Sequence, residues 1–154
     1  MQSLSRYPCE NAPGMDEAGR PAYYGNPAGV TDDMEVVRAI YAAFQRRDVE
    51  ATLPHFTTDC ELHFEGTGRL LGRETPYHGH AGMREYFADV ARTWEDLELH
   101  TDDFRLIPGY VIVIGHVTGQ QRGEPVRRAS VWTWQLRDGK VASVRASDMG
   151  PLQD

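Results

Sequence analysis

The feature that most constrains the fold is one amphipathic helix followed directly by a series of strand-like segments. Apolar residues recur at positions i, i+3, i+4 and i+7 over successive helical turns, and they are Met83, Tyr86, Phe87, Val90, Ala91 and Trp94. This stripe has to pack against an apolar surface, which the following strands can supply. Helices that cover one face of an antiparallel sheet predict an α+β fold.

The segments after this helix predict a bent antiparallel meander. Apolar and polar residues alternate over residues 97–101, and they alternate in the opposite phase over residues 104–106. The change of phase at Asp102 and Asp103 predicts a β-bulge, which bends a sheet. Further strands are predicted over residues 110–114, 126–136 and 141–148, with turns at Pro108-Gly109 and Asp138-Gly139. A bent sheet capped by a helix encloses a cone-shaped interior, where a pocket can form.

The first half of the chain predicts two helices and a strand. Asp32 and Glu35 have the spacing of a helix-capping box, and an apolar face follows them: Val36, Val37, Ile40, Tyr41 and Phe44. Asp48 can cap a short second helix, and alternation over residues 61–65 predicts a strand. Residues 1–30 are rich in Pro and Gly and show no period. They predict an extended N-terminal arm in front of one domain that covers residues 31–154.

Composition limits the partners and the compartment. The chain of 154 residues carries a formal net charge of -7, which disfavours nucleic acid and anionic membrane as partners. Two cysteines, Cys9 and Cys60, are too few for a disulfide framework or a zinc site. No apolar run has the length of a signal peptide or a membrane span, so we expect a cytoplasmic protein.

Three parts of the chain form a familiar combination. They are Val36-Val37-Arg38-Ala39-Ile40-Tyr41-Ala42-Ala43-Phe44 with Arg47-Asp48, Tyr77-His78-Gly79-His80-Ala81-Gly82-Met83-Arg84-Glu85-Tyr86-Phe87, and Val131-Trp132-Thr133-Trp134 with Arg137-Asp138-Gly139-Lys140-Val141. Their order and element types resemble the SnoaL-like, ketosteroid-isomerase-like family of the nuclear transport factor 2 superfamily, over residues 32 to about 150. The resemblance implies an α+β barrel, in which a cone-shaped, curved antiparallel sheet wraps around helices.

This resemblance implies a range of functions. The family includes polyketide cyclases, ketosteroid isomerases, epoxide hydrolases, dehydratases and members without known catalysis. We therefore expect a cofactor-independent acid–base enzyme of cyclase, isomerase, dehydratase or epoxide hydrolase type. Its substrate would be a small apolar oxygenated metabolite, such as a polyketide or terpenoid intermediate of a biosynthetic pathway. The alternative is a non-catalytic, dimeric module that binds small molecules. Ketosteroid isomerase chemistry is not expected, because Ile40, Phe64 and Trp132 stand where those enzymes carry a tyrosine and two aspartates.

Asp148 is the first catalytic candidate. If Trp132 points into the pocket, the alternation of side chains places Ser130 inward beside it, and the resemblance places Asp148 inward on the last strand. A carboxylate among aromatic side chains loses hydration, which predicts a raised pKa for Asp148 and a role as general acid or base. The alternative is that Asp148 ends the strand in solvent or caps a turn before Gly150-Pro151.

His63 and Tyr86 are the other catalytic candidates. His63 and Glu65 share a strand face and can form a proton-transfer pair, although the apolar residues between and before them fit the inward face better. Tyr86 lies on the apolar stripe of the long helix and can donate a hydrogen bond to a substrate oxygen, the alternative being core packing. No metal or other cofactor is expected, because His78 and His80 lack a full ligand set.

The same parity and resemblance predict a pocket wall and a dimer face. Substrate-binding residues are expected to be Ile40, Phe44, Phe64, Met83, Phe87, Gly115, Val117, Ser130, Trp132, Trp134 and Ala146. Among them, Gly115 is expected to leave space for a ligand. Curved sheets of the family often pair back to back, so the outward residues Ile112, Ile114, Val131 and Thr133 predict a homodimer.

Overall fold

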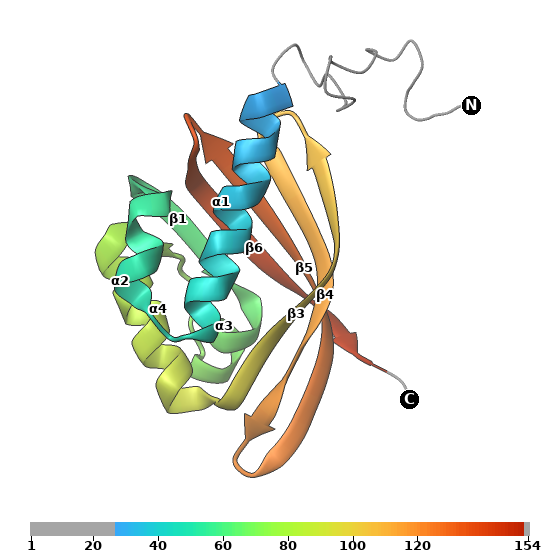
Figure 1. The fold of residues 1–154 in the computed structure, drawn as a ribbon. Coiled ribbons are helices and arrows are strands. Elements are labelled where there is room, and N and C mark those ends of the chain that lie inside the picture. The colour runs from blue at the N-terminus through green and yellow to red at the C-terminus, as the bar shows by residue number, and fades with distance from the viewer. Residues whose placement is uncertain (1–26, 153–154) are drawn as a thin grey trace, which may run out of the picture.

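The computed structural model of the protein describes residues 27–152, in which helices cover one face of a curved sheet (Figure 1). Most of the predicted arm lies outside the described residues, whereas residues 27–30 already belong to the first helix. Proline is well tolerated at the start of a helix, because its missing N–H group would have no partner there. The predicted α+β class, with a curved sheet around helices, is confirmed.

Helices and two strands precede the meander along the chain. The helices are α1 (Pro27–Gln45), α2 (Val49–Thr52), the 3-10 turn η2 (Leu53–His55), α3 (Glu65–Leu71) and α4 (Gly79–Thr93). The strands are β1 (Phe56–Phe64), β2 (Tyr77–His78), β3 (Glu95–Ile107), β4 (Tyr110–Gln121), β5 (Glu124–Arg137) and β6 (Lys140–Pro151). Among residues 27–152, no helix has the length and apolar character needed to cross a membrane.

The six strands form one open sheet in the order β2-β1-β6-β5-β4-β3. Strands β3 to β6 are the predicted antiparallel meander, while β1 runs parallel to β6 and lies next to it, with Phe64 paired to Ala146. The first strand of the chain therefore lies beside the last. This pairing brings α3, which follows β1 directly, close to the end of β6.

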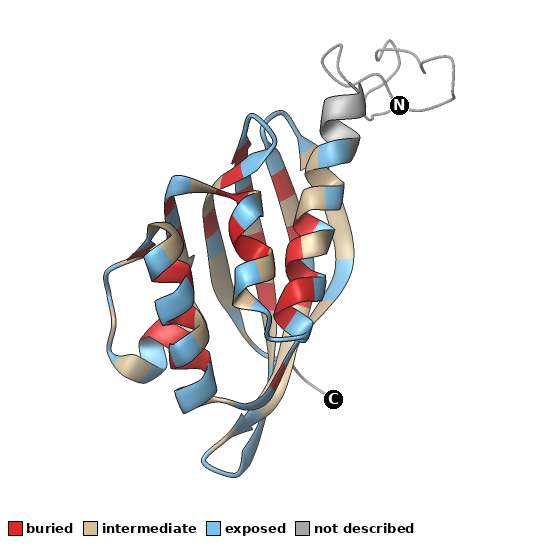
Figure 2. Cartoon of the chain, turned by 60° about the vertical axis from the view of Figure 1, so that its left-hand side comes forward, coloured by how far each residue is buried: buried red, intermediate tan, exposed pale blue. Residues whose placement is uncertain are grey.

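The core lies between the helices and the inner face of the sheet (Figure 2). The predicted stripe on α4 is buried at Met83, Tyr86 and Val90. Tyr41 on α1 packs edge-on against Trp132 and Trp134 of β5, with ring centroids 5.6 and 5.4 Å away. The Trp134 indole N–H also donates a hydrogen bond to the Tyr41 hydroxyl at 3.2 Å, so these buried polar groups have a partner.

A buried polar pair fixes α4 to the short strand β2. The Tyr77 hydroxyl donates a hydrogen bond to Asp89 Oδ2 at 2.7 Å, and Arg92 pairs with the other carboxylate oxygen. The Arg73 guanidinium lies 3.8 Å from the centroid of the Tyr77 ring. These contacts hold α4 in a fixed position against the sheet edge, and Tyr86 with it.

The predicted bulge in β3 is confirmed, and it explains Gly115. The register of β3 on β4 shifts between Thr101 and Asp103, opposite Gly115. A Cβ atom on Gly115 would lie 1.9 Å from the His100 carbonyl oxygen. The expectation that Gly115 leaves space for a ligand is therefore wrong, because the backbone of β3 occupies that space.

The close approach at Gly115 predicts a large stability effect. We expect Gly115→Ala to lower the free energy of unfolding by about 3 kcal/mol, because the new methyl group meets backbone that cannot move without breaking the bulge. Urea unfolding measures this change. Gly66→Ala is the control, since a Cβ there meets nothing within 4 Å. Equal stability of the two variants would contradict the close approach.

Candidate functional site

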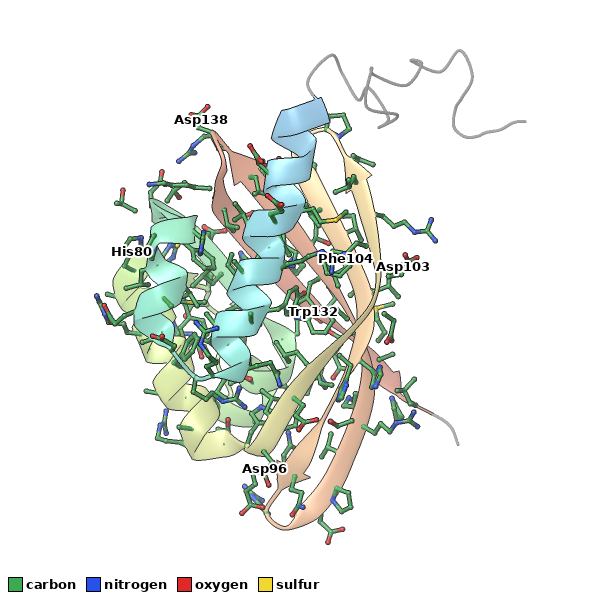
Figure 3. All side chains as sticks on the ribbon, in the orientation of Figure 1. His80, Asp96, Asp103, Phe104, Trp132 and Asp138 are labelled. Carbon is green, nitrogen blue, oxygen red and sulfur yellow. The ribbon has the colours of Figure 1, made fainter. Side chains whose placement is uncertain are left out.

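A cavity of about 240 Å³ lies between α3, α4 and the inner face of strands β1 and β3 to β6. Its apolar wall consists of Phe64, Leu70, Tyr86, Trp94, Leu97, Leu99, Val117, Ala129, Trp132 and Ala146. Its polar side chains are Thr67, Arg69, Gln121, Arg128, Ser130 and Asp148. Figure 3 places Trp132 on the face of the sheet that the helices cover. A mostly apolar hollow with a few convergent polar groups is the usual form of a small-molecule site.

Aromatic rings form one wall of this cavity. The Tyr86 ring stacks on Phe64, with centroids 3.8 Å apart and an interplanar angle of 16°. Thr67 on α3 accepts a hydrogen bond from the Trp94 indole at 3.2 Å and also hydrogen-bonds with the Tyr86 hydroxyl. Burial raises the pKa of Tyr86, and the Thr67 hydrogen bond only partly opposes this effect. The Tyr86 hydroxyl therefore stays protonated near neutral pH, as a hydrogen-bond donor needs to be.

Asp148 lies at the polar side of the cavity with both carboxylate oxygens engaged. It is paired with Ser130 in the register of β5 and β6, and its side chain is 6% exposed. Oδ1 accepts from the Gly150 amide at 2.9 Å and from Arg128 Nε at 2.9 Å. Oδ2 accepts from Arg69 Nη1 at 2.7 Å and from Arg128 Nε at 2.8 Å. Asp148 and Trp132 thus share one face of the sheet, as predicted.

The predicted direction of the Asp148 pKa is wrong. Burial does act to raise the pKa of Asp148, but the Gly150 amide and the Arg128 and Arg69 guanidiniums outweigh it, so the pKa lies below its ordinary value. Asp148 is ionised at neutral pH and has no proton to donate. The bond from the Gly150 amide also fits the alternative of a turn cap, since Gly150 has φ 102°.

The predicted pair of His63 and Glu65 does not form. His63 contacts Glu61 at 2.8 Å and lies outside the residues that line the cavity. Glu65 leaves the strand because β1 ends at Phe64 and α3 begins, and its carboxylate accepts from the Asp148 amide at 3.1 Å. Its other oxygen lies 3.4 Å from Arg145. His63 is therefore on the solvent side of β1, as its parity indicated.

Apart from Gly115, the predicted substrate-binding residues separate into two groups. Those that line the cavity are Phe64, Val117, Ser130, Trp132 and Ala146. The others pack in the core or against it, and these are Ile40, Phe44, Met83, Phe87 and Trp134. The second group is lost from the site because α1 and α4 pack directly on that part of the sheet. Gly115 is excluded by the β3 backbone.

The sequence prediction missed the two arginines of the site. Arg128 lies two residues before Ser130 on β5, so strand alternation could have placed it on the same face. Arg69 had no such signal, because its segment contains several glycines and so has the composition of a loop, whereas it forms helix α3. Within the described residues, no group of His, Cys, Asp and Glu side chains has the geometry of a metal site.

Comparison with known proteins shows the family. A model of the SnoaL-like domain matches residues 37–144, so the chain belongs to this family of SnoaL-like domains. No curated protein matches the chain in sequence.

Solved structures show the same fold. An NTF2-like protein of unknown function from Burkholderia pseudomallei superposes with a TM-score of 0.70 and 21% identity, over 76% of this chain and 90% of that one. TerC, co-crystallized with polyporic acid, has a TM-score of 0.69 and 29% sequence identity, and the match covers 76% of this chain and 91% of TerC. A protein of ketosteroid isomerase-like fold from Catenulispora acidiphila, in complex with trimethylamine, has a TM-score of 0.63 and 15% sequence identity. The match covers 73% of this chain and 84% of that protein.

The lowered pKa predicts how the stability contribution of Asp148 depends on pH. A carboxylate whose pKa is lower in the folded state stabilises the fold above its unfolded pKa of about 3.9, and this contribution is lost as pH falls through the folded pKa. We expect Asp148→Asn to lower the free energy of unfolding by about 1–3 kcal/mol at neutral pH. The difference from wild type should stay constant down to about pH 5 and then shrink toward about pH 3.

Urea unfolding of both proteins at a series of pH values measures this difference. The control is Asp59→Asn, because the Asp59 side chain is 70% exposed and its ion pair with Arg137 is on the surface. If the stability of the wild type relative to Asp148→Asn increased as the pH fell from about 7 to about 5, the pKa of Asp148 would be raised in the folded state. That outcome would contradict the lowered pKa.

Proposed function

We propose that this protein is a cofactor-independent acid–base enzyme that acts on a small, largely apolar, oxygenated metabolite. The observation that carries the proposal is a buried, ionised carboxylate at the edge of an aromatic-lined cavity, with a protonated tyrosine in the same wall. Membership of the SnoaL-like family is consistent with cyclase, isomerase, dehydratase or epoxide hydrolase chemistry. The volume of about 240 Å³ limits the part of the substrate that is enclosed to a small molecule.

The proposed roles follow from the protonation states. Asp148 accepts a proton from the substrate or from a water molecule, because it is ionised at neutral pH. The Tyr86 hydroxyl donates a hydrogen bond to the substrate oxygen on which negative charge develops. His63 has no role in this scheme, because it does not line the cavity.

The low basicity of Asp148 restricts the substrate. A carboxylate with a lowered pKa is a weak base, so it removes a proton efficiently only from an acidic group. A carbon between two carbonyl groups is such a group, whereas an unactivated carbon is not. This argument favours a polyketide-type substrate over a terpenoid hydrocarbon. TerC, which was crystallized with polyporic acid, supports the binding of a small oxygenated acid in this fold.

A non-catalytic binding module is the second candidate function. The observation in its favour is that both oxygens of Asp148 already accept two hydrogen bonds each. A carboxylate held in this way serves well to orient Arg69 and Arg128 for a ligand. A ligand that is retained without conversion would favour this function.

We also propose that the protein is a cytoplasmic homodimer. The support is on the outer face of the sheet, where Ile114 is 42% exposed beside the half-buried Ile112, Val131 and Thr133. Adjacent strands β4 and β5 bring these side chains together into one apolar area. A pair of copies related by a two-fold axis could cover this area.

The Asp148→Asn variant tests the proposed enzyme. The assay offers the protein a 1,3-diketone, an enone, a β-hydroxyketone and an aryl epoxide, and follows conversion by mass spectrometry, including deuterium uptake in D₂O. We expect wild type to convert at least one compound and Asp148→Asn to be about 100-fold slower or more, because the amide cannot accept the proton. Asp59→Asn, on the surface, is the matched control and should retain wild-type rates. Equal rates for wild type and Asp148→Asn would remove Asp148 from the mechanism.

A further inference from the structure

The cavity carries a local excess of positive charge. Among the described residues, its charged lining groups are Arg69, Arg128 and Asp148, which sum to one positive charge. The Glu65 carboxylate, which accepts a hydrogen bond from the Asp148 amide, lies 3.4 Å from Arg145, so these two charges offset each other. The chain as a whole has a formal net charge of -7, so this positive site is opposite in sign to the net charge of the protein.

The two guanidiniums keep donors for a further partner. Arg128 contacts Asp148 through Nε, and Arg69 contacts it through Nη1. Each guanidinium has five N–H donors, so neither is exhausted by these contacts. A carboxylate in contact with their remaining N–H groups would form charge-assisted hydrogen bonds, which are about twice as strong as neutral ones.

Exposure decides which charge a ligand meets. The Asp148 side chain is 6% exposed, whereas the side chains of Arg69 and Arg128 are 62% and 34% exposed. A molecule that enters the cavity therefore meets the more exposed guanidiniums before the carboxylate, which also lines the cavity but lies deeper. Asp148 fixes the orientation of both arginines, since it holds them from the strand side at 2.7 to 2.9 Å.

We propose that Arg69 and Arg128 form an anion-binding subsite, and that the ligand is a small aromatic compound with one ionised carboxyl or enol group. The acidic oxygens bind the guanidiniums, and the ring lies among Phe64, Tyr86 and Trp132. This inference rests on the proposed small-molecule function of the same cavity and specifies its ligand class. Asp148 is a positioning residue in this subsite.

The test compares two probes of equal shape and different charge, 2-naphthoate and 2-naphthamide, by isothermal titration calorimetry at neutral pH. We expect wild type to bind the carboxylate about tenfold more tightly than the amide. Arg128→Met and Arg69→Met should each reduce this preference toward unity while retaining the affinity for the amide. Urea unfolding confirms that each variant is folded.

Arg127→Met is the matched control, because Arg127 precedes Arg128 on β5 and strand alternation directs its side chain to the opposite face. This variant loses the same charge and should keep the preference. Equal binding of the two probes to wild type, or an equal loss in Arg127→Met, would overturn the subsite. Failure of both probes to bind would overturn it as well. Turnover of the neutral compounds described above is measured separately, so the enzyme proposal can stand if the subsite falls.

Discussion

The bend in strands β3 and β4 is the constraint on which the rest of the structure depends. The bulge between Thr101 and Asp103 lies opposite Gly115, and the missing side chain of Gly115 lets the two strands bend sharply together.

The bend divides the inner face of the sheet into a filled part and a hollow part. On one side of the bend, α1 and the core fill the inner face at Phe104, Leu106, Val111, Val113, Trp134 and Leu136. On the other side the inner face borders the cavity at Leu97, Leu99, Val117, Arg128 and Ser130. Trp132 belongs to both sides, because it packs on Tyr41 and also lines the cavity. The hollow persists because α3 and Trp94 cover this half of the sheet without filling it.

The charge state of Asp148 follows from the same arrangement. The parallel pairing of β1 with β6 places α3 over the end of β6, so that Arg69 reaches a carboxylate 79 positions further along the chain. Arg128 reaches the same carboxylate from the neighbouring strand β5. Burial alone would favour the neutral acid, but two guanidiniums and the Gly150 amide favour the ion more strongly. The acid–base character of the site is thus set by residues on three separate elements.

The sequence predicted those features of the fold that depend on the residues of a single helix or strand. The stripe of α4 and the bulge near Asp102 could be read from spacing, whereas the shared inward face of Trp132 and Asp148 was implied by the family resemblance. Helix α3 could not, because a segment with Gly66, Gly68 and Gly72 has the composition of a loop, and its helical state depends on packing against β6 and α4. The parallel contact of β1 with β6 has no local signature either.

The candidate site shows the same division. Alternation and the family resemblance together placed Phe64, Val117, Ser130, Trp132 and Ala146 on the inward face, and these residues line the cavity. Neither could tell which inward positions are covered by a helix. Ile40, Phe44 and Trp134 are inward and yet belong to the filled core. The direction of the Asp148 pKa shift was mispredicted for a related reason. The sequence shows the apolar neighbours of a strand, but it does not show that an arginine of a distant helix contacts the carboxylate. A prediction of desolvation without its partner charges gives the wrong direction.

The two proposed properties of the cavity are coupled through the arginines. In the free protein Arg69 and Arg128 direct their charge to Asp148, which makes it a weak base. An anionic group bound to the same guanidiniums would share their hydrogen bonds and add negative charge near the carboxylate, and both effects raise the pKa of a carboxyl group. Ligand binding would therefore increase the basicity of Asp148 at the moment when a proton acceptor is needed. A neutral ligand would not do so, and this difference provides a physical basis for selecting acidic substrates in a fold that does not by itself specify a reaction.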